Sequence, residues 1–90
     1  EVCRLSSRRY ALPQHLNELA QILLRVQEEA SDEQAITVIA MKAHWGLGRN
    51  LTVEVLEYFD EIRFTRRVGQ ARKVIAPGLP GEQFARYTDQ

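Results

Sequence analysis

The chain has 90 residues, of which 44% are hydrophobic and 27% charged, with twelve basic and twelve acidic side chains. This length and composition predict one small globular domain and exclude collagen-like chains, disordered chains and enzymes built around a deep cleft. The net charge of zero, taken over the whole chain, argues against a nucleic-acid partner, because neutralising phosphates requires a basic excess.

Cysteine and histidine usage excludes several kinds of site. Cys3 is the only cysteine, which excludes an intrachain disulfide and a cysteine-based zinc finger, and we expect its thiol to be inert. His15 and His44 have no partner at metal-ligand spacing, so we expect no metal site. A small chain without disulfides and without an apolar run of about 20 residues predicts a cytoplasmic protein that does not enter membranes. The start at Glu1, without an initiator methionine, favours a segment of a longer protein.

The first third of the chain predicts a short strand followed by a helix. The strand covers residues 9–12 and ends at Pro13, which has no backbone N–H for a sheet but suits the first turn of a helix. Apolar residues then recur every three or four positions, which predicts an amphipathic helix of about four turns over residues 14–30.

Two further helices and a turn are expected next. Thr37 has the side chain of an N-cap and precedes a short apolar helix. Gly46 and Gly48 then predict a turn, and a third helix is expected over residues 50–62 with Asn50 as its N-cap. The short, glycine-bearing junction is typical of a helix-turn-helix.

The last predicted element is a β-hairpin. Residues 64–68 and 71–75 are both rich in strand-forming residues, and Gly69 and Gln70 join them. The proline- and glycine-rich residues 77–81 end the domain. The fold prediction is therefore α+β: a winged helix over residues 1–76, with a three-helix bundle, a helix-turn-helix and a C-terminal hairpin wing, followed by a tail over residues 77–90.

The charges are unevenly placed along the chain. Residues 1–41 hold four basic and six acidic side chains, whereas residues 42–76 hold seven basic and four acidic ones. Five basic residues and no acidic one lie between Arg63 and Lys73, on or beside the predicted wing. Arg49 lies where the third helix begins, next to unpaired backbone N–H groups that favour a phosphate. Charge alone leaves two interpretations open: nucleic-acid contact, or a solvated hairpin edge that discourages aggregation.

Several aromatic and acidic residues have a structural interpretation. Trp45 has two interpretations, stacking on a base or packing at the edge of the core, and a lone tryptophan beside a turn favours the core. We also expect Phe59 to belong to the core and Tyr58 to reach toward the hairpin. Glu57 and Asp60 lie three residues apart on one helix. We expect them to pair with wing arginines rather than to act as an acid–base pair, because no nucleophile accompanies them.

Three segments at fixed offsets carry a more specific signal. Residues 46–51, 56–60 and 64–72 read GLGRNL, LEYFD and FTRRVGQAR. Together they resemble the last winged-helix repeat of the bacterial selenocysteine-specific elongation factor family, SelB. The resemblance is strong over about a third of the chain, and the first strand and helix match it only in pattern.

The resemblance implies a function in translation. It implies an RNA-binding module that recognises the SECIS hairpin of a messenger RNA, so that a UGA codon is read as selenocysteine. The chain has no G-x-x-x-x-G-K-[ST] motif, so the GTPase of the family is expected elsewhere in the full-length factor and this part is expected not to be an enzyme. No cofactor is expected here, and GTP and Mg²⁺ would belong to the GTPase portion. The ribosome and selenocysteinyl-tRNA would be partners of the full-length factor, and the module itself is expected to be monomeric.

The residues expected to contact RNA lie at the start of the third helix and on the wing. They are Arg49, Asn50, Arg66, Arg67, Gly69, Gln70, Arg72 and Lys73.

Three positions depart from the family pattern. Asn50 stands where lysine is frequent, which removes one charge. Arg63 stands where glycine is usual, at the end of the third helix. Gln70 replaces an aspartate or asparagine in the wing turn, a position that often needs a left-handed conformation.

Two other functions fit a winged helix. One is a DNA-binding domain of a transcription regulator, with the third helix in the major groove. Glu54, Glu57, Asp60 and Glu61 on that helix would repel phosphates over most of its length. The other is a protein-interaction spacer, for which Arg49→Ala and Arg66→Ala would leave RNA affinity unchanged.

Overall fold

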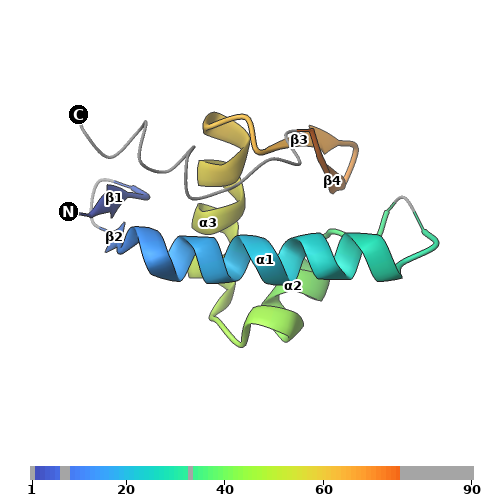
Figure 1. Ribbon diagram of the computed structural model, residues 1–90, viewed down its shortest axis with the longest axis horizontal. Coiled ribbons are helices and arrows are strands. Elements are labelled where there is room, and N and C mark those ends of the chain that lie inside the picture. The colour runs from blue at the N-terminus through green and yellow to red at the C-terminus, as the bar shows by residue number, and fades with distance from the viewer. Residues whose placement is uncertain (1, 7–8, 33, 76–90) are drawn as a thin grey trace.

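The computed structural model describes residues 2–6, 9–32 and 34–75 (Figure 1). Two short hairpins enclose three helices in chain order. The elements are β1 (Cys3–Arg4), β2 (Tyr10–Ala11), α1 (Pro13–Glu29), α2 (Val38–Trp45), α3 (Arg49–Glu61), β3 (Thr65–Val68) and β4 (Ala71–Val74).

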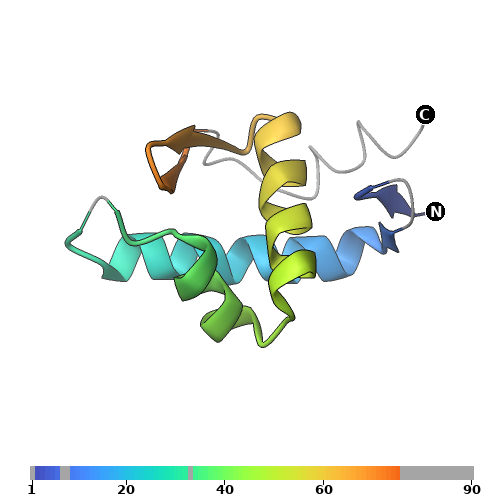
Figure 2. The ribbon, with the colours of Figure 1, turned by 180° about the vertical axis from the view of Figure 1, so that it is seen from behind.

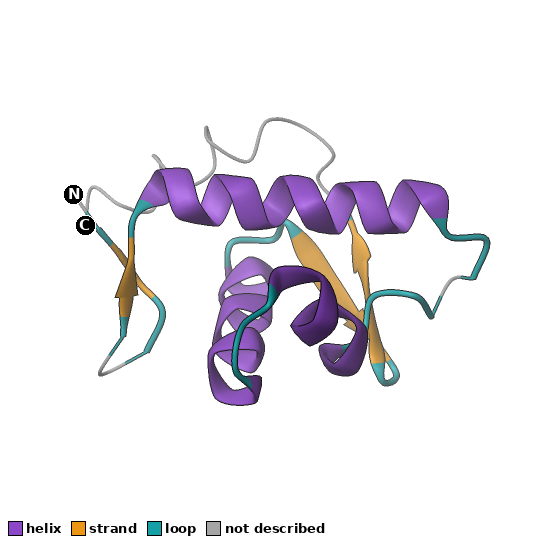
Figure 3. Ribbon diagram, turned by 90° about the horizontal axis from the view of Figure 1, so that it is seen from below, coloured by secondary structure: helices purple, strands orange, loops and turns teal. Residues whose placement is uncertain are grey.

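The arrangement of these elements confirms the predicted winged helix. Helix α1 runs along one side of the molecule, and α2, α3 and the β3–β4 hairpin all lie beneath it (Figure 3). Helix α3 crosses α1 and leads directly into the hairpin, which forms the wing (Figures 1 and 2). The β1–β2 hairpin lies near the start of α1, at the other end from the wing.

Helix α1 buries one stripe of side chains. Leu16, Ala20 and Leu23 are fully buried, at the spacing that places residues on one helical face. The prediction of a helix over residues 14–30 is correct to within one residue at each end. The helix begins at Pro13, because a proline in the first turn loses no intrahelical hydrogen bond.

Helix α2 has the predicted cap. The Thr37 hydroxyl accepts a hydrogen bond from the Ala40 N–H at 3.1 Å. At the other end, Gly46 takes the left-handed conformation (φ 69°) and its N–H bonds to the Lys42 carbonyl. Local chemistry therefore sets both ends of this eight-residue helix.

The predicted start of α3 at Asn50 is wrong. The N-cap is Gly48, whose carbonyl accepts the Thr52 N–H at 2.9 Å and the Thr52 hydroxyl at 2.8 Å. The bond from the Thr52 N–H to the Gly48 carbonyl makes Arg49 the first helical residue and Asn50 the second, so the Asn50 side chain does not cap the helix. Glycine serves as an N-cap nearly as well as a polar residue, which is why side-chain type misplaced the boundary.

The hydrophobic core centres on Phe59. Its ring meets Phe64 and Trp45 edge-to-face, with centroids 5.2 and 6.1 Å apart, and lies 6.3 Å from Tyr58. Trp45 is buried and its indole N–H donates to the Leu19 carbonyl at 3.0 Å. The predicted core roles of Trp45 and Phe59 are confirmed, and Tyr58 is buried beside them.

The wing is an antiparallel hairpin with the predicted pairing. Val68 faces Ala71 across the two-residue turn, in which Gly69 has the positive φ (63°). Glycine at the first central position is what a type II′ turn requires, so the left-handed conformation falls on Gly69 and not on Gln70. The Val74 N–H donates to the Gln27 side chain at 2.9 Å, which attaches the wing to α1.

Arg63, the residue that connects α3 to the wing, is strained. It adopts φ 64°, and its N–H bonds to the Asp60 carbonyl at 3.1 Å. A left-handed residue just past a helix is usually glycine, because a Cβ there crowds the backbone. The family's usual glycine fits this conformation better than the arginine found here.

The N-terminal hairpin contains the first predicted strand in shortened form. Cys3 pairs with Ala11 and Arg4 with Tyr10. Cys3 is buried in the core, and Arg9 forms an ion pair with Glu54 of α3, Nε to Oε2, at 2.9 Å. The first hairpin is thereby fixed to α3 and to the core.

Within residues 2–6, 9–32 and 34–75, no helix is long and apolar enough to cross a membrane. The same residues contain no cluster of three metal-ligating side chains. The predicted tail over residues 77–90, and with it the domain boundary, lies outside the described residues.

Candidate nucleic-acid interface

A groove of about 630 Å³ lies between the wing, the start of α2 and one face of α3. Four residues predicted to bind RNA line it: Arg49, Arg67, Gln70 and Arg72. They come from two elements that are far apart in the sequence, the first turn of α3 and the hairpin. The tertiary structure thus gathers half of the predicted set around one hollow.

Arg67 and Arg72 lie directly opposite each other in the wing ladder, and they have different environments. Arg67 is exposed, and its Nε donates to the Gly69 carbonyl at 3.2 Å. Arg72 is only 4% exposed, and its Nε donates to Asp60 Oδ2 at 3.2 Å. Arg67 therefore offers a solvated charge to a ligand, whereas the charge of Arg72 is neutralised within the fold.

Arg49 is exposed at the first position of α3. The backbone N–H groups of the first helical turn have no intrahelical partner and carry the positive end of the helix dipole. A cationic side chain beside these groups favours an anion such as a backbone phosphate. Asn50 is exposed in the same turn and adds a neutral donor.

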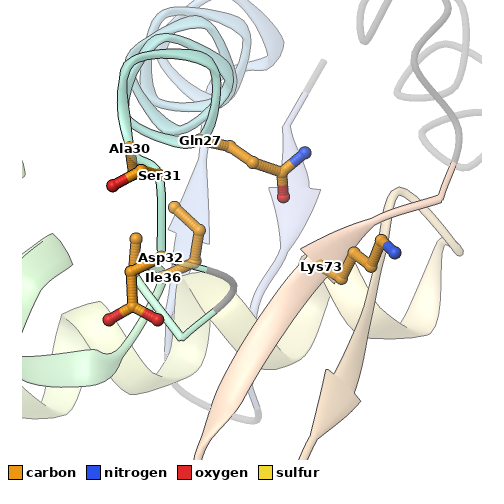
Figure 4. A pocket seen from close by; sticks show the side chains of 7 residues that line it. Gln27, Ala30, Ser31, Asp32, Ile36 and Lys73 are labelled. Atoms are coloured by element: carbon orange, nitrogen blue, oxygen red, sulfur yellow. The ribbon is translucent and has the colours of Figure 1, made fainter.

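The remaining predicted residues lie elsewhere on the wing. Arg66 lines a second hollow of about 390 Å³ together with Asp60, Arg63 and Arg67, so Arg67 borders both hollows. Lys73 lines a small pocket of about 170 Å³ beside the end of α1 (Figure 4). Gly69 occupies the wing turn, where its carbonyl accepts from Arg67. Arg66 and Lys73 pair with each other one position away from the Arg67–Arg72 pair, on the alternate face of the hairpin, and neither of them lines the groove.

The acidic residues of α3 have separate roles. Asp60 forms the expected ion pair with a wing arginine, Arg72. Glu57 instead lines the groove, is exposed, and has no ion pair within the described part of the chain. The groove therefore contains one carboxylate among its arginines, which restricts where a phosphate can lie.

Sequence reasoning missed the apolar side of the groove. Val38, Ile39 and Val53 line it, and Ile39 is 83% exposed. The sequence signal for it was the pair of adjacent apolar residues, Val38 and Ile39, which cannot both face the core from one turn of a helix.

Comparison with known proteins supplies the family. No curated protein matches the sequence. The family profile described as "Elongation factor SelB, winged helix" matches residues 28–74, which is just over half of the chain. A solved structure of the mRNA-binding domain of elongation factor SelB from E. coli, in complex with SECIS RNA, is 27% identical with a TM-score of 0.75. The match covers 83% of this chain and 60% of that one. The chain therefore belongs to the winged-helix family of elongation factor SelB.

Proposed function

We propose that this domain recognises a SECIS-type hairpin in messenger RNA, as the C-terminal RNA-binding module of a larger GTP-dependent elongation factor. The proposal is supported by the groove that Arg49, Arg67 and Gln70 line together, on a fold similar to that of a domain solved in complex with SECIS RNA. Selenocysteine incorporation at a UGA codon is the process in which the full-length factor takes part.

The groove chemistry suits a folded hairpin better than a regular duplex. A-form RNA presents its base edges poorly in a deep and narrow major groove, so a small domain reads loops and bulges more readily. Arg49, Arg66 and Arg67 would hold backbone phosphates and so set the position of the RNA. Gln70 and the polar groups of the groove would contact a base.

The remaining functions belong to other parts of the factor. The sequence has no phosphate-binding G-x-x-x-x-G-K-[ST] loop, so GTP and Mg²⁺ would bind outside these 90 residues. We expect the ribosome and selenocysteinyl-tRNA to be partners of the full-length factor, in the cytoplasm. The module itself would bind RNA as a monomer and catalyse no reaction.

The charge on α3 disfavours a DNA-reading role. A helix that enters the major groove usually exposes arginine, lysine, asparagine or glutamine to base edges. The exposed residues of α3 beyond its first turn include Glu57 and Glu61. These carboxylates would face the phosphates on either side of the DNA groove.

A binding titration tests the proposal. The domain is titrated with a SECIS-type hairpin and with the same hairpin lacking its bulged nucleotide, at one salt concentration. We expect the intact hairpin to bind at least about tenfold more tightly, because shape and base contacts add to charge. Equal affinity for both hairpins and for duplex DNA would contradict specific recognition. A salt slope of log K near zero would contradict nucleic-acid binding altogether, and would favour the protein-interaction spacer.

A further inference from the structure

Asp60, at the end of α3, is bound to both strands of the wing. Its Oδ1 accepts a hydrogen bond from the Thr65 hydroxyl of β3 at 2.6 Å. Its Oδ2 accepts from Arg72 Nε of β4 at 3.2 Å. One carboxylate thus contacts two adjacent strands, which limits how the hairpin can rotate relative to the helix.

Arg72 extends this contact to the start of α2. Its backbone N–H donates to the Ile36 carbonyl at 2.8 Å, two residues before α2 begins. The same residue therefore joins β4 to α3 through its side chain and to the α2 entrance through its backbone. These three elements are the walls of the groove.

Burial makes the Asp60–Arg72 contact obligatory. The Arg72 side chain is 4% exposed and that of Asp60 is 25% exposed. A guanidinium withdrawn from water is costly unless a carboxylate and further hydrogen bonds compensate it. Replacing Asp60 with a neutral residue would leave the buried Arg72 guanidinium without its carboxylate partner.

We propose that Asp60 and Thr65 are positioning residues for RNA recognition. Together with Arg72 they fix the wing against α3. This inference rests on the proposed function. Neither residue needs to contact RNA: they determine whether Arg67 and Gln70 on the wing lie at the correct separation from Arg49 on the helix. Arg72, by this assignment, holds the groove together and is not primarily a phosphate ligand.

The decisive comparison is Asp60→Asn against Glu61→Gln. Both variants remove one negative charge from neighbouring positions on α3, and Glu61 has no ion pair within the described residues. Simple electrostatics predicts that both variants bind RNA more tightly, since each removes a repulsive charge. The positioning role predicts that Asp60→Asn binds about tenfold more weakly while Glu61→Gln binds as well as or better than the parent.

The salt dependence separates positioning from direct neutralisation of phosphates. The slope of log K against log salt reports how many phosphates are neutralised, and Asp60 neutralises none. We therefore expect Asp60→Asn to change the affinity without lowering the slope, whereas a variant that removes Arg67 lowers it. A merely structural role would lower the thermal midpoint and leave the affinity of the folded molecules unchanged.

Hydrogen exchange gives a readout that does not involve RNA. The amide of Arg72 should exchange faster in Asp60→Asn, and the amide of Leu23 in α1 should be unaffected. If Asp60→Asn does not fold, Thr65→Val removes the hydrogen bond to Asp60 with no change of charge and little change of volume. Thr65→Ser is the control, because it keeps the hydroxyl that donates this bond. We expect weaker binding for Thr65→Val and parent-like binding for Thr65→Ser.

Two results would overturn the inference: equal RNA affinity for Asp60→Asn and Glu61→Gln, or unchanged exchange at Arg72. Failure of the proposed function looks different. In that case the parent domain itself does not discriminate the hairpins, while Asp60→Asn still accelerates exchange in the wing.

Discussion

The two hairpins of this domain are similar in composition and different in use. Both are antiparallel pairs of short strands that carry arginines, and they lie toward opposite ends of α1. In the first hairpin, Arg4 Nε donates to the Ser6 carbonyl at 3.2 Å and Arg9 forms an ion pair with Glu54. In the wing, Arg66 and Arg67 are exposed and form no ion pair within the described residues.

A count of arginines therefore does not identify an interface. What matters is whether a carboxylate of the same fold already neutralises the charge. The structure places Glu54 against the first hairpin and Asp60 against only one of the wing arginines. The wing therefore has solvated cations beside the groove, whereas Arg9 of the first hairpin is paired with Glu54 and helps to stabilise the fold.

The largest expected effect compares the two hairpins directly. Arg66→Gln with Arg67→Gln should weaken binding of a SECIS-type hairpin on the order of 10- to 100-fold, and should lower the salt slope by roughly 0.7 to 0.9 for each phosphate that is no longer neutralised. Arg4→Gln with Arg9→Gln removes the same charge and should change the affinity by about twofold or less. Fluorescence titration at several salt concentrations measures both. Equal reductions in affinity would show that total charge alone drives binding.

The next effect concerns Arg49, the groove residue outside the wing. Arg49→Gln should reduce the affinity about fivefold and the salt slope by roughly 0.7 to 0.9, because the variant no longer neutralises a phosphate at the helix start. The same titration measures it, and Arg25→Gln on α1 is the matched control. An unchanged slope would remove the start of α3 from the interface.

A third prediction concerns the two left-handed residues that flank β3. Arg63→Gly should stabilise the domain by about 1 kcal/mol, because glycine relieves the strain at φ 64°. Gly69→Ala should destabilise it by about 1 kcal/mol for the converse reason, since space for the methyl group is available there. The midpoints of urea unfolding measure both changes. Shifts of the same sign would contradict the strain argument.

The smallest effect is expected at the first hairpin. Arg9→Ala should lower the free energy of unfolding by about 0.5 kcal/mol, because the Arg9 side chain is 48% exposed and solvent screens its pair with Glu54. The destabilisation should shrink as salt is added. Urea unfolding at low and high salt measures it. Arg25→Ala, which breaks no ion pair within the described residues, provides the reference. A larger destabilisation at high salt would be inconsistent with a screened pair.

Local sequence features predicted much of the fold. The spacing of Leu16, Ala20 and Leu23 indicates α1 and its buried face, and the Thr37 hydroxyl determines where α2 begins. Gly69 marks the wing turn because positive φ is cheap only for glycine. These features are predictable because each depends on residues within about one helical turn. The start of α3 was misplaced because Gly48 caps through its backbone, which residue type does not reveal.

The candidate site was predictable in part. Sequence position correctly suggested that the start of α3 and the wing belong together, and the groove confirms that Arg49 and Arg67 line one hollow. The sequence did not indicate that Arg66 and Lys73 lie outside that hollow. Strand alternation defines the two faces of a hairpin, but it does not show which face packs against α3.

Periodicity, caps and turn residues act over short distances, so the sequence was enough to predict the three helices and the wing hairpin. The family was indicated separately, by the motifs in residues 46–51, 56–60 and 64–72. Which arginines are accessible to a ligand depends on the tertiary fold. Arg67 and Arg72 are five residues apart and chemically identical, yet one is solvated and the other is buried against Asp60. Burial and charge pairing arise from contacts between elements distant in the chain, and the sequence order does not contain those contacts.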